Sequence, residues 1–240
     1  MVIEEFEQIF NDYLKELNIE LNKSQILKFY KYMNLLIEWN EKINLTAIIE
    51  PKEIILKHFV DSLTISKYIK ENAKVVDVGT GAGFPGIPLK IFRDDIDIVL
   101  VDSLNKRLKF LQEVINELEL DNVELIHSRA EEFGKNKKYR ESFDISTSRA
   151  VANLATLSEY LIPLLKKDGY AICMKGNSID DEIKNANVAI KVLGGKVDII
   201  DEFNLPKSDN KRTILGIKKI KETPAKYPRK PGLPAKEPIL

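Results

Sequence analysis

The stretch that decides the fold is Val75-Val76-Asp77-Val78-Gly79-Thr80-Gly81-Ala82-Gly83-Phe84-Pro85-Gly86. An apolar, β-branched run leads directly into a loop with four glycines, and Pro85 suits the first turn of a following helix. Glycines let the chain turn sharply and let a ligand approach the backbone amides closely. A strand, a glycine loop and a helix in this order are typical of a nucleotide or nucleoside cofactor site.

Two cofactors fit the spacing of these glycines. Gly81, Gly83 and Gly86 match the G-x-G-x-x-G pattern of dinucleotide sites, and Gly79, Gly81 and Gly83 match the G-x-G-x-G pattern of S-adenosylmethionine enzymes. Asp77 favours the second, because a carboxylate repels a pyrophosphate but attracts a sulfonium and an amino group. We therefore predict S-adenosylmethionine as cofactor, bound by Asp77, Gly79, Gly81 and Gly83, with NAD as the alternative.

Beyond residue 74, short apolar runs alternate with helical stretches. The predicted strands cover residues 74–78, 97–101, 122–126, 142–146, 169–174, 196–201 and 213–218. The predicted helices cover residues 85–92, 105–120, 129–134, 151–167 and 178–193. This alternation predicts an α/β fold with a mostly parallel sheet of seven strands, covered by helices on both faces. The last two strands lack an intervening helix, so we expect an antiparallel hairpin at the sheet edge.

The chain ends differ from this central region. Residues 1–70 show helical spacing of apolar residues and predict an N-terminal helical extension. Residues 71–220 form the predicted α/β domain. Residues 221–240 form a tail that contains five of the ten prolines, so we expect it to be extended, without a helix. Residues 211–240 hold nine basic and two acidic residues in a chain of zero net charge, which suggests a local anionic partner.

Composition excludes several classes of protein. A single cysteine, Cys173, excludes an internal disulfide, and the only two histidines, His58 and His127, exclude a multi-histidine metal centre. We therefore expect no metal. The first residues lack the basic start and apolar run of a signal peptide, and no apolar stretch approaches the roughly 20 residues that span a bilayer. We expect a soluble cytoplasmic protein.

Further candidates stand where predicted strands end. Asp102 ends the second strand, and an acid there can accept hydrogen bonds from ribose hydroxyls in either cofactor. After the third strand, Ala130 leaves room for a flat base and Glu131 can accept a hydrogen bond from an amino group. The alternative for these two residues is an ordinary helix start with acids in its first turn.

Five segments of the chain resemble one family. They are VDVGTGAGFPGIPL from Val76, NLTAI at Asn44–Ile48, KHFVDSL at Lys57–Leu63, SRA at Ser148–Ala150 and RKPGLPAKEP from Arg229. They are similar to segments of the RsmG (GidB) family, bacterial methyltransferases that modify N7 of a guanine in the 530-loop region of 16S rRNA. The resemblance covers nearly the whole chain. It implies a class I methyltransferase fold with an N-terminal helical extension. It also implies that Gly79, Phe84 and Arg149 line the cofactor site, with Ala130 and Glu131 at the adenine.

The residues bear on the target atom as well. Class I amino-methyltransferases often carry an Asn/Asp-Pro-Pro-aromatic motif after the fourth strand, where this chain has Ser146-Thr147-Ser148-Arg149. That departure argues against methylation of an exocyclic amine. Guanine N7 has a free lone pair, so no general base is required and catalysis rests on placement. Methylation of pyrimidine C5 needs a thiolate, but Cys173 lies in a predicted buried strand.

The partner expected from the resemblance is 16S rRNA, within the small ribosomal subunit or its precursor, and we expect a monomer. Arg149 and Lys175 are candidates to position RNA phosphates or the guanine O6. Arg229 and Lys230, which prolines hold exposed, and His58 with Asp61 are further candidates for RNA contacts. Two other functions stay open: an NAD-dependent oxidoreductase, and an RNA-binding module with a non-catalytic cofactor site.

Overall fold

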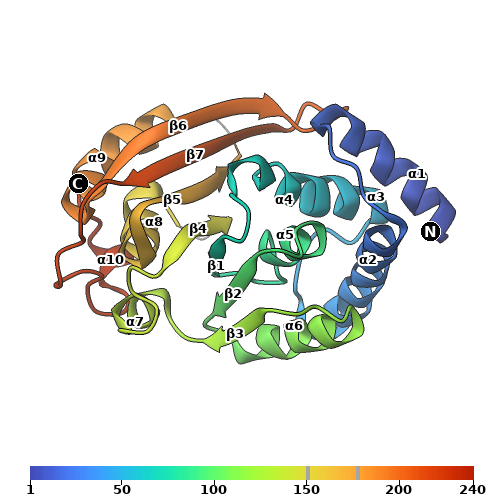
Figure 1. Cartoon of the computed structure of the whole chain (residues 1–240), viewed down its shortest axis with the longest axis horizontal. Helices are drawn as coiled ribbons and strands as arrows, with labels where there is room; N and C mark the ends of the chain where they lie inside the picture. The colour runs from blue at the N-terminus through green and yellow to red at the C-terminus, as the bar shows by residue number, and fades with distance from the viewer. Residues whose placement is uncertain (150–151, 177–178) are drawn as a thin grey trace.

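The computed structural model describes residues 1–149, 152–176 and 179–240. Its centre is a seven-stranded sheet with the strand order β3-β2-β1-β4-β5-β7-β6 (Figure 1). The strands β1 to β5 are parallel, and β7 runs antiparallel to both of its neighbours. The predicted α/β fold is thereby confirmed, with β6 at the sheet edge. The strands are β1 (Lys74–Val78), β2 (Asp97–Asp102), β3 (Val123–His127), β4 (Phe143–Arg149), β5 (Leu165–Lys175), β6 (Gly195–Asn204) and β7 (Lys211–Lys219).

Helices cover both faces of this sheet (Figure 1). One face carries α1 (Ile3–Leu14), α2 (Lys23–Ile43), α3 (Pro51–Ile54), the π-helical segment Ile55–Val60, α4 (Asp61–Leu63), α5 (Gly86–Phe92) and α6 (Asn105–Glu117). The other face carries α7 (Ala130–Lys135), α8 (Leu154–Leu161), α9 (Asp180–Leu193) and the short α10 (Leu233–Lys236). Ala150 of the SRA motif and the starts of the predicted helices 151–167 and 178–193 lie outside the described residues.

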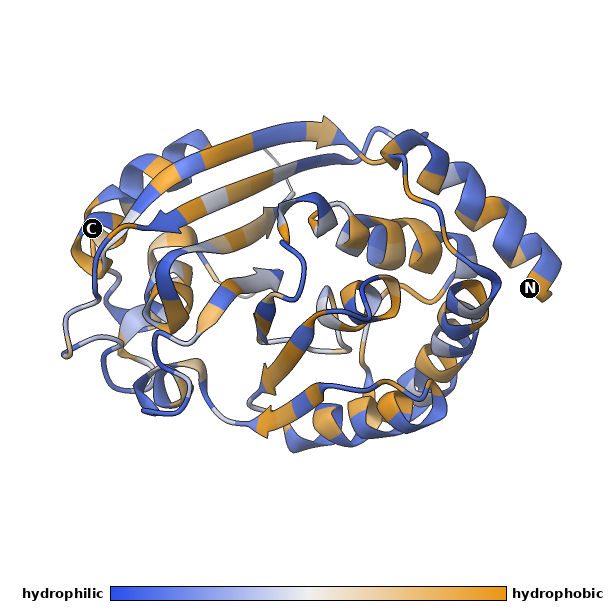
Figure 2. Cartoon of the chain, viewed as in Figure 1, coloured by the Kyte–Doolittle hydropathy of each residue, from blue (hydrophilic) through white to orange (hydrophobic). Residues whose placement is uncertain are grey.

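Two apolar layers hold the helices on the sheet. Along β1, Val75 packs with the N-terminal helices, whereas Val76 and Val78 pack with α8 and its neighbours. This alternation follows from the period of two in a strand, so a sheet covered on both faces is apolar throughout its centre. Figure 2 shows apolar residues along the central strands and polar residues on the outer faces of the helices. Cys173 is fully buried in the second layer.

The N-terminal helices share their core with the sheet. Phe6, Phe10 and Phe29 pack around Phe59, with ring centroids 5.1 to 6.4 Å from that of Phe59. Tyr32 stacks on Phe59, and its hydroxyl donates a hydrogen bond to the carbonyl of Ala82 in the glycine loop. Burial of aromatic rings is a major source of stability, so this packing fixes the extension firmly beside the loop.

The tail departs from the prediction. Residues 233–236 form one helical turn, α10, with Pro234 in its first turn. Proline is compatible with that position because the first N–H groups of a helix have no intrahelical partner. The expectation of an extended tail without a helix was therefore wrong, and Tyr227, Pro228 and Pro234 are buried. Among the described helices, none is both long and apolar enough to cross a membrane.

Candidate active site

A cleft lies at the carboxyl ends of β1, β2 and β4, and two adjoining hollows of about 270 and 440 Å³ form it. Both hollows are lined by Gly79, Asp102 and Ser103, so they lie side by side. Together they reach the size of small-molecule sites, about 300–1,000 Å³. The first hollow is also lined by Val78, Val101, Ser128, Arg129, Ala130, Glu131, Tyr160, Gly232 and Ala235. The second is also lined by Leu45, Thr46, His58, Thr80, Gly81, Ala82, Phe84, Arg107 and Arg149.

The glycine loop forms the floor between the hollows. The N–H groups of Gly79 and Thr80 donate to the carbonyl of Val101, at 2.8 and 3.1 Å, which ties the loop to β2. Gly79 and Gly81 have φ angles of +72° and +62°, a region that side chains disfavour. Gly83 lines neither hollow. A Cβ on Gly83 would lie 2.8 Å from the Tyr32 hydroxyl, so this glycine serves helix packing.

Asp77 lies beneath the loop and lines neither hollow. Its Oδ2 accepts hydrogen bonds from Thr80 Oγ1 at 2.7 Å and from the Gly86 N–H at 3.0 Å. Burial raises the pKa of this carboxyl to about 6, and the two donors act against that rise. Its Oδ1 is buried and has no hydrogen-bond partner among the described residues. Asp77 therefore shapes the loop directly and adds negative charge under the place predicted for the cofactor.

Asp102 is the acid that faces both hollows. Its Oδ2 accepts the Gly81 N–H at 2.9 Å and Arg107 Nη1 at 3.2 Å, and its Oδ1 accepts the Leu104 N–H at 2.9 Å. A carboxylate oxygen accepts two hydrogen bonds, so Oδ1 retains a lone pair for a ligand hydroxyl. Next to it, Ala130 and Glu131 line the first hollow. This donor and acceptor set fits a nucleoside, with an acid for its ribose and another for an amino group on its base.

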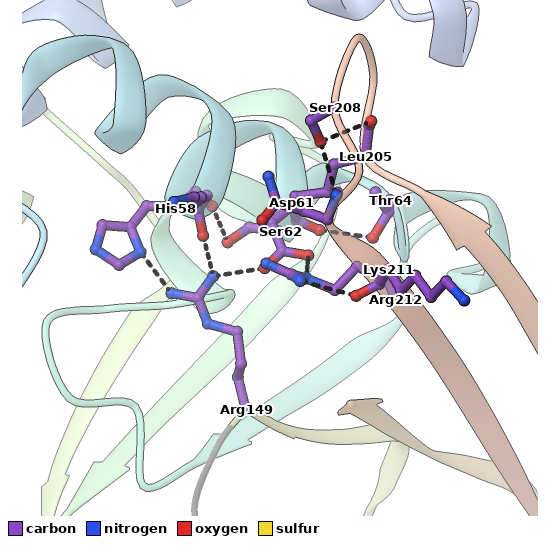
Figure 3. A network of polar contacts seen from close by, with 11 residues as sticks. His58, Asp61, Ser62, Thr64, Arg149, Leu205, Ser208, Lys211 and Arg212 are labelled. Carbon is purple, nitrogen blue, oxygen red and sulfur yellow. Dashed lines mark hydrogen bonds and ion pairs between the residues drawn. The ribbon is translucent and has the colours of Figure 1, made fainter. Parts of the chain in front are cut away.

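Arg149 is held in a polar network at the end of β4 (Figure 3). Its Nη1 donates to the carbonyl of Lys57 at 2.9 Å and to Asp61 Oδ2 at 3.3 Å. The other oxygen of Asp61 accepts Arg212 Nε at 3.0 Å. Two arginines from β4 and β7 thus meet on one carboxylate, and the exposed fraction of the Asp61 side chain is only 4%.

His58 completes this network as a neutral ring. Burial, and then the charge of Arg149, lower the pKa of His58 to about 3. Arg149 Nη2 lies 3.0 Å from Nδ1, and because arginine only donates, Nδ1 must be the acceptor. The proton is therefore on Nε2, which donates to Thr46 Oγ1 at 2.9 Å. The ring also stacks on Phe84, with 4.3 Å between centroids.

Other predicted site residues lie away from the cleft surface. Both carboxylate oxygens of Asp61 are bound by arginines. Lys175 Nζ forms an ion pair with Glu182 at 2.7 Å and donates to the Ala152 carbonyl. Arg229 forms an ion pair with the fully buried Glu159. These partners argue against the RNA contacts predicted for Asp61, Lys175 and Arg229. Lys230 is exposed, as expected.

The sequence reasoning missed several residues of the cleft. Thr46 lines the second hollow and lies within the NLTAI segment, which resembles the family but does not by itself indicate a site residue. Arg107 lies in the first turn of α6, five residues after Asp102, and no motif in the sequence marks it. Tyr160 and Gly232 are distant in sequence from every motif, and no local signal places them at the first hollow.

Comparison with known proteins shows the family of the chain. The chain matches the family described as GidB, rRNA small subunit methyltransferase G, over residues 25–213. It is 57% identical over 227 residues to the ribosomal RNA small subunit methyltransferase G of Desulforamulus reducens, covering 94% of this chain and 95% of that protein. It is 50% identical to the protein of the same name from Clostridium novyi, covering 98% and 99%. Among solved structures, a SAM-dependent methyltransferase from Aquifex aeolicus superposes with a TM-score of 0.52 at 19% identity, covering 71% of this chain and 94% of that one.

Proposed function

The chain belongs to the rRNA small subunit methyltransferase G family, and from this premise we propose that it transfers the methyl group of S-adenosylmethionine to N7 of a guanine in the 530-loop region of 16S rRNA. The observation that carries the proposal is that the two hollows adjoin at Gly79, Asp102 and Ser103, which line both. A nucleoside held in the first hollow has its reactive end directed toward the second, where a base can enter.

In this proposal, the first hollow holds the adenosine. Asp102 accepts hydrogen bonds from the ribose, Ala130 packs on the base, and Glu131 accepts from the exocyclic amino group. Gly79 and Gly81 let the backbone approach the ligand, because no Cβ stands between the loop and the cleft. The cofactor supplies an electrophilic methyl group on a positively charged sulfur. Asp77, ionised at neutral pH beneath the loop, favours that positive charge electrostatically.

The second hollow holds the target guanine, between the glycine loop and the segment that carries Thr46 and His58. N7 attacks with its own lone pair, so no proton has to leave first. His58 is suited to such a site because both ring nitrogens are already engaged and the ring is neutral at physiological pH. Its role, with Phe84 and Arg149, is to form a rigid wall that places the base and excludes water.

Exposed basic residues beside the cleft bind the RNA phosphates in this proposal. Arg129 lines the first hollow and is exposed. Lys230 is also exposed and lies two residues before Gly232, which lines the same hollow. Such contacts position a nucleic acid without reading its sequence. We propose that the protein acts as a monomer in the cytoplasm, on the small ribosomal subunit or its precursor.

The test uses S-adenosylmethionine with a labelled methyl group and small ribosomal subunits from a strain that lacks this protein. After incubation, the 16S rRNA is digested and its nucleosides are separated by mass spectrometry. We expect labelled 7-methylguanosine with the wild-type protein. Asp102→Ala should reduce the label strongly, because it removes the acid that faces both hollows. The matched control is Asp198→Asn, which changes an exposed carboxylate on the edge strand β6 and should leave the label unchanged.

The outcomes separate the alternatives. Label in another nucleoside would overturn N7 as the target atom and keep the methyltransferase. Measurable cofactor binding without transfer to subunits or to their precursors would favour the RNA-binding module. Absence of cofactor binding would overturn the interpretation of the first hollow itself.

A further inference from the structure

The C-terminal tail, residues 221–240, borders the first hollow. Gly232 and Ala235 line this hollow together with Gly79, Asp102 and Glu131. In Figure 1 the tail passes beside α7 and α8, on the face of the sheet opposite the N-terminal helices. A segment with the highest proline content of the chain thus contributes one wall of the site that holds the adenosine.

An ion pair anchors the tail at Arg229. The backbone N–H of Arg229 donates to Glu159 Oε1 at 2.6 Å, and its Nη2 donates to Glu159 Oε2 at 2.7 Å. Glu159 lies on α8 and is fully buried. A buried carboxylate needs such a partner, because a charge without one is strongly disfavoured inside a protein. The chain direction at Arg229 is therefore set by α8.

A second anchor acts on the predicted adenine ligand itself. The N–H of Gly232 donates to Glu131 Oε1 at 2.7 Å. The Tyr160 hydroxyl also donates to Oε1, at 3.5 Å, so both of these hydrogen bonds fall on the same oxygen of Glu131. Gly232 has a φ angle of +83°, which a glycine adopts readily, and this turn presents its N–H to the carboxylate. One oxygen is fixed by the tail, and the other remains for a ligand.

The tail is seated on both sides of these anchors. Upstream, Arg140 donates to the carbonyls of Thr223 and Tyr227, each at 2.7 Å. Downstream, Thr156 Oγ1 donates to the carbonyl of Pro234 at 2.9 Å. Gly134 of α7 leaves room for Pro228, since a Cβ there would lie 2.8 Å from the proline ring. The contacts come from α7, α8 and the loop after α7, and together they hold the tail against the hollow.

We propose that the segment Arg229–Ala235 is part of the cofactor site: it covers the adenosine, and the Gly232 N–H positions Glu131 so that its second oxygen reads the exocyclic amino group of adenine. Arg229 is a positioning residue in this scheme, acting through Gly232 and Glu131. The inference rests on S-adenosylmethionine as cofactor, but it does not depend on the RNA target.

The experiment measures cofactor affinity without RNA. Isothermal titration calorimetry determines the Kd of S-adenosylhomocysteine and of S-inosylhomocysteine, in which a carbonyl replaces the amino group of adenine. The wild-type protein should bind the adenosyl compound at least about tenfold more tightly, because a carbonyl cannot donate to Glu131. Arg229→Gln should weaken binding of the adenosyl compound about tenfold and reduce this preference, since the tail no longer fixes Glu131. Glu131→Gln should abolish the preference.

The matched control is Lys221→Gln, which removes an exposed charge at the start of the same tail, outside the proposed segment, and should leave both Kd values unchanged. Circular dichroism at the titration temperature verifies that each variant is folded. Wild-type affinity in Arg229→Gln would overturn the proposal. Equal weakening of both compounds, with the preference intact, would overturn the positioning of Glu131. A failure of the proposed N7 methylation would leave these binding results unchanged, so the two proposals fail separately.

Discussion

The two ends of the cleft are walled by segments from opposite ends of the chain, and each wall is fastened by a buried carboxylate paired with arginine. The N-terminal wall has Asp61 bound by Arg149 and Arg212. The C-terminal wall has Glu159 bound by Arg229. The two walls differ in the residues that pack against these ion pairs. Phe59 and the surrounding aromatic rings embed the first wall in the core, whereas the second is held by hydrogen bonds, the buried ring of Tyr227 and two buried prolines.

The two walls therefore differ in whether an arginine can reach solvent when its carboxylate partner is removed. Arg149 and Arg212 project from β4 and β7, whose backbones are held in the sheet, so both guanidinium groups stay close to Asp61. Arg229 lies on a tail that can move into solvent together with its charge. We therefore expect damage to the first wall to reduce the free energy of unfolding and damage to the second to reduce cofactor affinity.

The largest effect is expected for Asp61→Asn. The neutral amide no longer balances the positive charges of the two arginines. Breaking a buried ion pair lowers the free energy of unfolding by about 3 kcal/mol or more. Urea unfolding should show this loss in the free energy of unfolding, and methyl transfer should fall because Arg149 and His58 lose their support. The control is Asp12→Asn, whose exposed pair with Lys207 is screened by solvent and should contribute little to the free energy of unfolding. Equal stability of the two variants would break the comparison.

Glu159→Gln makes the same chemical change in the second wall, and its effect on stability should be smaller. The amide oxygen still accepts the N–H of Arg229, and the guanidinium can hydrate, so we expect a loss of about 1 kcal/mol. The Kd for S-adenosylmethionine should rise about tenfold. If instead Glu159→Gln unfolds the protein as readily as Asp61→Asn, the tail belongs to the core and the two walls are equivalent.

Asp77→Asn sharpens the comparison at the loop between the walls. Burial raises the pKa of Asp77 in the folded state to about 6 from an ordinary value of 3.8. Its stabilising contribution is complete below pH 3.8 and is lost as the pH rises through 6. Between pH 5 and pH 7.5, the wild-type protein should lose about 1 kcal/mol relative to the variant. Urea unfolding at both pH values checks this, and a constant difference would contradict a raised pKa.

The last prediction concerns the ring signals of His58, for which no change is expected. Its pKa of about 3 in the folded state lies below the ordinary value of 6.5, so the ring stays neutral at physiological pH. Its contribution to stability is present above pH 6.5 and declines as the pH falls toward 3. Nuclear magnetic resonance should show no change in the His58 ring signals between pH 5 and pH 8. Movement of these signals near pH 6.5 would mean that the network around Arg149 is open to water.

The sequence by itself determined the sheet and the glycine loop. Residues 74–78 were predicted as a strand at the observed bounds, and the glycine pattern after it identified the floor of the cleft. Both signals are local, since strand periodicity and glycine spacing act over a few neighbouring residues. The strand predicted at 169–174 begins earlier, at Leu165. The polar residues near the start of β5 interrupt the apolar run on which the prediction depends.

Only the tertiary structure decided how the charged residues are used. Nothing near Arg229 in the sequence indicates a partner 70 residues away, yet its ion pair with Glu159 sets the course of the tail. Asp61 and Asp77 are both acids next to motifs, but one holds two arginines and the other holds a loop. The partner of a charge depends on which elements the fold brings together, because electrostatic energies fall with distance in space and not with separation along the chain.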